Sequence, residues 1–368
     1  MRVTIVGAGI MGLSTAWALA RGGHSVTVLD QGPVPNPLGT SVDEHRLIRS
    51  AYGASRGYTT MVDDAFAAWD RMWADLGRRQ YHETGVLAIT SEGQDDWVRQ
   101  SAETLEALGR PVAWLDRDAF AARYPLLTTE RMVRAFHLPT GGTLYAGAIV
   151  EHLARHLSGR GVTIRPHTPV ADVDPDRARV RLADGTVEDA DALVVAAGAW
   201  IGRLVPSVAG RVTPSRQVVV YLTPPPETQA AWAAMPMILE IDPRAGFYLV
   251  PPVPGAGLKI GDHRFSLRGD PDLDREAAAD EVEDIVRLGR TRIRDWDRYR
   301  TLRAKTCFYT VERTEEFVVE RLAARTWALS PCSGHGFKFG AVLGEGAARA
   351  LVDETWAAAF PDWAAGRA

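Results

Sequence analysis

The sequence contains very little cysteine, with only two such residues among 368, at positions 307 and 332. A framework of several disulfides is therefore excluded, and we do not expect these two cysteines to form one. The chain also lacks an excess of basic residues, because 42 lysines and arginines are balanced by 46 aspartates and glutamates. The resulting net charge of −4 predicts neither a nucleic-acid surface nor a basic membrane patch.

Long apolar runs are absent as well, and no stretch approaches the roughly 18 residues needed to span a membrane. The first 20 residues superficially resemble a signal peptide, but their glycines are spaced for a turn between a strand and a helix. We therefore expect a cytoplasmic protein that does not associate with membranes. Since 46% of the residues are hydrophobic, a chain of this length can fill the cores of two domains.

A strand, a helix and a second strand are predicted at residues 3–6, 13–20 and 26–29, which together make a βαβ unit. Gly7, Gly9 and Gly12 form a complete G-x-G-x-x-G motif between the first strand and the helix. Such glycines allow a tight turn, a close approach of the backbone to a pyrophosphate, and close packing of helix and strand. Asp30 ends the second strand, where a carboxylate can accept a hydrogen bond from a ribose hydroxyl.

The motif predicts a dinucleotide but does not distinguish FAD from NAD, and a plain glycine turn is the alternative. Asp30 disfavours NADP, because it would repel a 2′-phosphate. From about residue 213 the strands are short and separated by prolines, which is typical of an antiparallel sheet that carries a site. We expect an α/β fold with a Rossmann-like dinucleotide-binding domain at 1–80, 143–212 and 305–368, which becomes an FAD-binding domain under the resemblance described next. The inserted substrate domain would comprise residues 81–142 and 213–304.

Four further segments carry a resemblance to a known family: RLIRSAYG at 46–53, GLKIG at 257–261, TCFYT at 306–310 and SGHGFKF at 333–339. With the N-terminal motif, they resemble the monomeric sarcosine oxidase and N-methyltryptophan oxidase family along nearly the whole chain. The resemblance implies a monomeric FAD enzyme that acts on a small amino-acid or imino-acid substrate and O2. The segments around Cys307 and at 333–339 are the specific ones.

The resemblance also implies roles for individual residues. Cys307 matches the cysteine bonded to the flavin, while Arg49 and Lys338 match the pair that binds the substrate carboxylate. Arg46 and Lys259 match basic residues beside the flavin ring, the lysine being associated with oxygen reduction. The other matching positions are His263, Tyr248 and Tyr309 in the substrate pocket, and Gly7, Gly9, Gly12, Asp30, Val170, Gly334, Gly336, Phe337 and Lys338 at the cofactor.

The residues themselves allow simpler interpretations. Arg46 and Arg49 would share one face of a helical turn, as a solvated pair or as a carboxylate site. Lys259 lies in an apolar strand, either at an exposed edge or where its charge stabilises negative charge that develops on oxygen. Without the resemblance, Cys307 would be interpreted as a small buried hydrophobe.

Two positions depart from the family pattern. Residues 42–45 read Val-Asp-Glu-His where the family has small residues and glycine. Glu83 replaces a different polar residue and is either a solvated residue at a strand entry or a contact for the substrate N–H. These differences make sarcosine itself doubtful as the substrate, and a related enzyme class in this family oxidises cyclic imino acids such as piperideine or pipecolate carboxylates.

We therefore predict an FAD-dependent oxidase that transfers a hydride from the carbon next to nitrogen to flavin N5, forming an imine and H2O2. Two alternatives remain at this point. One is a flavin dehydrogenase that passes electrons to a carrier, and the other is a non-catalytic dinucleotide-binding redox sensor.

Overall fold

The computed structural model describes residues 1–91, 96–242 and 244–367. Its N-terminal strands lie in a six-stranded sheet in which every neighbouring pair is parallel except β19–β20. The predicted βαβ unit is confirmed, since β1 and β2 pair in parallel around α1. In spatial order the strands are β19 (Val318–Ala323), β20 (Thr326–Ser330), β13 (Ala192–Val195), β1 (Arg2–Val6), β2 (Ser25–Leu29) and β9 (Thr163–Arg165).

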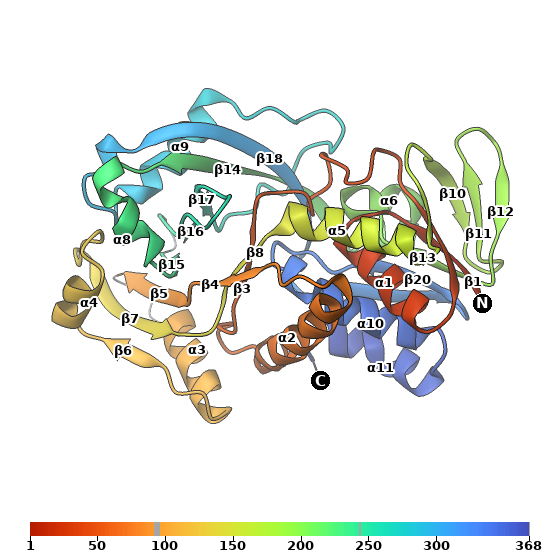
Figure 1. Cartoon of the computed structure of the whole chain (residues 1–368), viewed down its shortest axis with the longest axis horizontal. Coiled ribbons are helices and arrows are strands. Elements are labelled where there is room, and N and C mark those ends of the chain that lie inside the picture. Colours follow the sequence, from red (N-terminus) through yellow and green to blue (C-terminus); the bar gives the residue numbers. More distant parts are fainter. Residues whose placement is uncertain (92–95, 243, 368) are drawn as a thin grey trace.

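Helices cover this sheet and form the largest hydrophobic core with it (Figure 1). α1 packs against α10 and α5, and α10 also contacts α2 and α11. The helices are apolar on the faces that meet, so their burial is favoured by the hydrophobic effect. Their bounds are α1 (Ile10–Arg21), α2 (Arg56–Leu76), α5 (Ala146–Gly159), α10 (Gly340–Ala350) and α11 (Glu354–Ala364).

A second, eight-stranded sheet supplies the other half of the molecule. Its neighbouring strands are antiparallel except for the parallel pair β15–β5. The order is β18 (Arg300–Glu312), β14 (Val212–Thr223), β17 (Leu258–Asp262), β16 (Phe247–Val250), β15 (Met237–Ile241), β5 (Val86–Ser91), β7 (Met132–Leu138) and β6 (Ala113–Leu115). Helices α3 (Asp96–Ala107), α4 (Arg117–Arg123), α8 (Gln229–Ala233) and α9 (Ala279–Gly289) accompany it.

Two small antiparallel sheets complete the architecture. One contains β3 (Arg46–Ile48), β8 (Gly142–Leu144) and β4 (Tyr81–Glu83), and the other β10 (Val170–Asp174), β11 (Arg179–Leu182) and β12 (Val187–Asp189). The short helices α6 (Ile201–Leu204) and α7 (Pro206–Ala209) precede β14. The helical turn expected for Arg46 and Arg49 is wrong: Arg46 pairs with Leu144 in a β-ladder, so this segment is extended.

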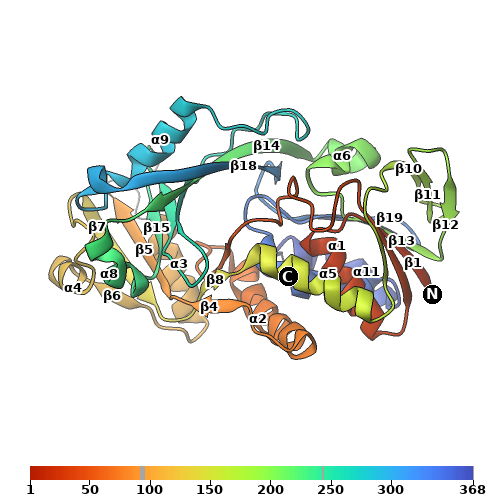
Figure 2. The same ribbon diagram turned by 45° about the horizontal axis from the view of Figure 1, so that its top comes forward.

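The long strands β14 and β18 connect the two halves (Figures 1 and 2). They pair with each other from Val212–Glu312 to Thr223–Arg300, whereas β17 pairs with β14 only from Val219 to Leu222. The part of this ribbon from Val212 to Val218 therefore extends beyond the large sheet toward the short helices α6 and α7 (Figure 2). The two sheets use chain segments close to those predicted for the two domains, and the domain bounds stay a prediction.

Candidate active site

A pocket of about 760 Å³ lies where the two large sheets meet. Its wall begins at the turn between β1 and α1 and continues along residues 196–200. It then includes side chains of β14, β16, β17 and β18 and ends at the segment 329–338. The pocket is thus continuous from the glycine motif to the predicted substrate residues, which is the arrangement that an extended dinucleotide requires.

Glycine is required at two places in the N-terminal turn. Gly7 has φ +106°, and an added Cβ would lie 2.3 Å from the carbonyl oxygen of Ala196. A Cβ on Gly12 would lie 1.9 Å from the carbonyl oxygen of Gly7, so α1 could not pack this closely with any other residue. Gly7 and Gly9 line the pocket, whereas Gly12 does not and contributes through packing.

Asp30 lies at the end of β2 and lines the same end of the pocket. Its Oδ2 accepts a hydrogen bond from the backbone N–H of Ala8 at 2.8 Å, and its Oδ1 accepts from Gly32 and Asn36. These contacts fix the carboxylate beside the motif. Among the described residues, Oδ2 has one protein donor, the N–H of Ala8. This oxygen can therefore still accept a hydrogen bond from a ribose hydroxyl. Val170, predicted at the cofactor, lines the wall nearby.

The opposite end of the pocket contains a buried cation, Lys338, and a partly buried one, Arg49. Lys338 is 4% exposed, and its Nζ donates to the hydroxyl of Tyr52 at 2.8 Å and to the carbonyl of His335 at 2.7 Å. The guanidinium of Arg49 lies over the rings of Tyr52 and Trp97, 4.4 and 5.5 Å from their centroids, and donates to the carbonyl of Ala51. Within the described ranges, neither cation has a carboxylate partner at ion-pair distance.

The positive charges of Arg49 and Lys338 repel each other. Burial and the neighbouring Arg49 hold the pKa of Lys338 well below its usual range. Burial likewise lowers the pKa of Arg49. A ligand carboxylate placed between the two would relieve the repulsion and accept charge-assisted hydrogen bonds.

A second charged cluster lies in the wall between the two ends. Lys259 on β17 is 1% exposed, and its Nζ donates to Asp43 at 3.1 Å and to the carbonyl of His45 at 2.8 Å. Arg46 also pairs with Asp43 and donates to the carbonyl of Thr40 at 2.8 Å. Lys259 and Arg46 line the pocket, whereas Asp43 lies behind them.

Aromatic side chains enclose the space near Arg49. Tyr248 on β16 packs against His263, with 5.9 Å between the ring centroids, and Tyr309 on β18 packs against Phe265. All four line the pocket. Desolvation, with a contribution from the charge of Arg49, lowers the pKa of His263 to about 4, so its ring is neutral at physiological pH.

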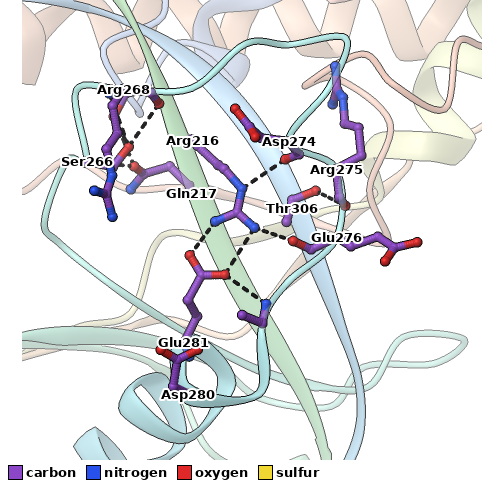
Figure 3. A network of polar contacts seen from close by, with 12 residues as sticks. Arg216, Gln217, Ser266, Arg268, Asp274, Arg275, Glu276, Asp280, Glu281 and Thr306 are labelled. Carbon is purple, nitrogen blue, oxygen red and sulfur yellow. Dashed lines mark hydrogen bonds and ion pairs between the residues drawn. The ribbon is translucent and has the colours of Figure 1, made fainter.

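The segment that carries His263 and Phe265 continues as a loop to α9 and is fastened to β14. The Arg216 guanidinium donates to the carbonyl of Asp274 at 2.8 Å and pairs with Glu281, and its backbone N–H donates to Arg268 (Figure 3). Gln217 adds a bond from its Nε2 to the carbonyl of Arg264 at 2.7 Å. These bonds hold the loop 263–278 across the pocket-lining part of the β14–β18 ribbon.

The side chains of two predicted site residues, Cys307 and Glu83, lie outside the wall. Cys307 is 4% exposed on β18 and is not among the lining residues, whereas Cys332 is. Glu83 ends β4, is exposed, and its carboxylate accepts from the hydroxyl of Tyr81. The structure therefore does not bring Glu83 to the pocket, and the expected contact with a substrate N–H lacks support.

The sequence did not reveal one wall residue, Trp97, and two residues outside the wall, Tyr52 and Asp43. Trp97 and Tyr52 hold Arg49, and Asp43 pairs with two of the predicted basic residues. Asp43 could have been suspected, because it lies in the segment 42–45 that departs from the family pattern. Trp97 had no such signal, since it follows the pattern of an ordinary amphipathic helix.

Comparison with known proteins decides the family. The family described as FAD dependent oxidoreductase matches residues 2–350. The chain belongs to the FAD-dependent oxidoreductases. It is 28% identical over 351 residues to the monomeric sarcosine oxidase of Bacillus sp. (strain B-0618), covering 93% of this chain and 90% of the relative. It is 26% identical to the N-methyl-L-tryptophan oxidase of Yersinia pestis (strain Pestoides F), covering 95% and 94%.

Solved structures show the same fold at low identity. NikD, described as an unusual amino acid oxidase essential for nikkomycin biosynthesis, superposes with a TM-score of 0.81 at 20% identity, covering 96% of this chain and 94% of that chain. The L-proline dehydrogenase of P. horikoshii superposes with a TM-score of 0.82 at 18% identity, covering 96% and 93%. The predicted α/β fold with an FAD-binding part is thereby confirmed.

The residues present fit FAD. A Cβ at Gly7 or Gly12 would collide with a backbone carbonyl, so the close turn needs glycine at both positions. The N-cap residue of α1, Gly9, has no side chain, and Ser41 accepts a hydrogen bond from the backbone N–H of Ile10, which leaves other N–H groups of the first turn for a phosphate. Gly334 has φ +77°, and a Cβ on Gly336 would lie 1.8 Å from the carbonyl of Pro331, so this wall segment is also restricted to glycine. Gly7, Gly9, Asp30, Gly334, Gly336 and Phe337 would hold the cofactor along the pocket.

Among the residues that the structure describes, no helix combines the length and apolarity needed to cross a membrane. The same residues contain no group of three or more His, Cys, Asp or Glu side chains placed to hold a metal ion.

Proposed function

We propose that this protein is an amine oxidase that acts on a small carboxylate bearing a secondary, N-methyl or cyclic amine. The observation that carries the proposal is the pair Arg49 and Lys338, a partly buried and a buried cation in one pocket, neither of which has a carboxylate at ion-pair distance in the described part of the chain. The names of the relatives, sarcosine oxidase and N-methyl-L-tryptophan oxidase, support the same substrate class.

FAD, when bound, supplies the two-electron chemistry by accepting a hydride from the carbon next to nitrogen and reducing O2, with two protons, to H2O2. Arg49 and Lys338 bind the substrate carboxylate and thereby fix the orientation of that carbon. Tyr248, Tyr309 and the neutral His263 exclude water from the amine. A neutral imidazole at this position does not repel a protonated amine, so the substrate can bind before it loses its proton.

The experiment is a panel of matched amines, with and without a carboxylate, read by both anaerobic bleaching of the FAD absorbance and peroxide release in air. We expect bleaching only with secondary or cyclic amino acids. Equal rates for amines without a carboxylate would contradict the proposal. Bleaching that is followed by electron transfer to a dye but not to O2 would identify a dehydrogenase, and no bleaching with any amine would favour the redox sensor.

We also propose that FAD is bonded to Cys307, which rests on the match of the segment 306–310 to the family. Cys332 is the matched control, because it is the other cysteine of the chain and it lines the pocket. After denaturation in acid, flavin fluorescence should stay with the wild-type protein and with Cys332→Ala but not with Cys307→Ala. Flavin released from the wild type, or retained by Cys307→Ala, would contradict this assignment.

A further inference from the structure

Lys259 is a cation held inside the protein rather than a surface lysine. Its strand β17 is buried from Leu258 to Gly261, and its ammonium faces the pocket wall between the glycine motif and Arg49. Two of its three N–H donors are directed to Asp43 and to the carbonyl of His45. A lysine in such a position needs a counterion, because desolvation disfavours the charged form.

Asp43 is that counterion, and each of its oxygens is fully used. Oδ2 accepts from Lys259 and Arg46, while Oδ1 accepts from the hydroxyl of Tyr221 and from the backbone N–H of Glu44 at 2.9 Å. The carboxylate is 6% exposed. Of the carboxylates that the structure describes, only Asp43 lies within ion-pair distance of Lys259.

The balance of charges in this cluster depends on one residue. Burial and the charge of Arg46 lower the pKa of Lys259 to about 8, and Asp43 opposes this decrease. Burial alone would raise the pKa of Asp43, but Lys259 and Arg46 hold it well below its usual range. Without the carboxylate, two neighbouring cations would remain in the wall, and the lysine would release its proton.

We propose that Asp43 is a positioning residue that keeps Lys259 charged and directed at the cofactor pocket, and that it thereby sustains the transfer of electrons from the reduced enzyme to O2. The inference rests on the proposed oxidase function. A fixed cation in this wall stabilises the negative charge that O2 acquires before two protons complete H2O2. Asp43 belongs to the segment that departs from the family pattern, so this chain supplies its own counterion.

The other titratable groups around the pair are His45, Cys307, Tyr221 and Lys305, and burial lowers the pKa of Lys305 from its usual value. Burial lowers the pKa of His45 to about 3 and raises that of Cys307, so neither changes charge near pH 8. Burial also raises the pKa of Tyr221. The cations that face Asp43 from other elements are Arg46 on β3 and Lys305 on β18, whose Nζ donates to the carbonyl of Val42.

The test measures reoxidation by O2 after the FAD has been reduced with dithionite, so that no amine is involved. In the wild type, the rate should fall as pH rises through about 8, where Lys259 loses its proton. In Asp43→Asn this fall should move at least one pH unit lower, which makes the variant about fivefold slower than the wild type at pH 8. At low pH the variant should regain at least the wild-type rate.

Matched variants separate charge from structure. Asp43→Glu should keep the wild-type profile, and so should Glu44→Gln, a neighbouring carboxylate that pairs with Arg303 rather than with Lys259. Lys259→Arg, whose charge does not titrate, should remove the pH dependence even if Asp43→Asn does not fold. An Asp43→Asn profile that superimposes on the wild type, or that is slow at every pH, would overturn the inference.

A measurement of thermal unfolding on the FAD-loaded protein tests the ion pair without any turnover. Asp43→Asn should lower the unfolding temperature, and adding Lys259→Met should recover part of the loss, because it removes an uncompensated buried cation. Strictly additive losses would overturn the inference. The reoxidation and unfolding tests do not depend on the amine panel. If no amine in the panel is a substrate, the proposed function is contradicted, whereas the role of Asp43 is still decided by these two tests.

Discussion

Replacing Lys338 by methionine removes the buried cation of the Arg49–Lys338 pair while keeping a side chain of similar length. Lys338 donates to the hydroxyl of Tyr52 and to the carbonyl of His335, so the variant leaves these two acceptors without their charged donor. Loss of one partner of a buried, charge-assisted contact costs about 2–5 kcal/mol. Even the lower value corresponds to about 30-fold weaker binding of a carboxylate.

The assay is a titration of the FAD-loaded protein with propionate, followed by the change in flavin absorbance. Tyr52→Phe is the control, since it removes the neutral hydroxyl partner of Lys338 but leaves the cation in place. We expect it to weaken binding by much less than Lys338→Met does. A change of less than about threefold in Lys338→Met would refute the assignment, because the lost interaction would then be worth under about 0.7 kcal/mol.

The affinity for propionate should change with pH in a direction that a loss of packing alone would not produce. Burial and Arg49 hold the pKa of Lys338 well below its usual range, and a bound carboxylate must raise it again. Binding therefore takes up a proton at any pH between these two values, and the affinity should fall as pH rises, by up to about tenfold per pH unit. Lys338→Met should abolish this slope, and a wild-type affinity that is flat with pH would contradict the argument.

Three other predictions follow from the described geometry. Glu83→Gln should leave the relative rates on the amine panel unchanged, because Glu83 lies outside the pocket; an altered profile would contradict this placement. Gly336→Ala should strongly reduce FAD binding, measured by the flavin content of the purified protein, since its Cβ would lie 1.8 Å from a carbonyl oxygen. Glu240 on β15 and Arg292 form an ion pair at 2.8 Å in which both side chains are at most 2% exposed. Glu240→Gln should lower the free energy of unfolding by about 3–5 kcal/mol in a denaturant titration, because it leaves Arg292 buried without its carboxylate partner; a loss under about 1 kcal/mol would contradict this.

The parts of the fold that were predictable are those with local signals. The strand, glycine turn and helix at the N-terminus occupy adjacent residues, so their spacing is sufficient to identify them. The segment at Arg46 was assigned wrongly because its conformation depends on pairing with β8, almost 100 residues later in the chain. Asp43 and Lys259 are 216 positions apart, and no local pattern could have shown that one neutralises the other.

The ribbon of β14 and β18 has a mechanical consequence for access to the pocket. Two domains joined by flexible linkers can separate by a hinge motion. In this protein, however, one continuous hydrogen-bonded ladder runs from one half into the other. Separating the halves as rigid bodies would require bending or breaking that ladder, at the cost of several backbone hydrogen bonds. Displacing the loop 263–278, which carries the wall residues His263 and Phe265, would instead require its side-chain contacts with Arg216 and Gln217 to break.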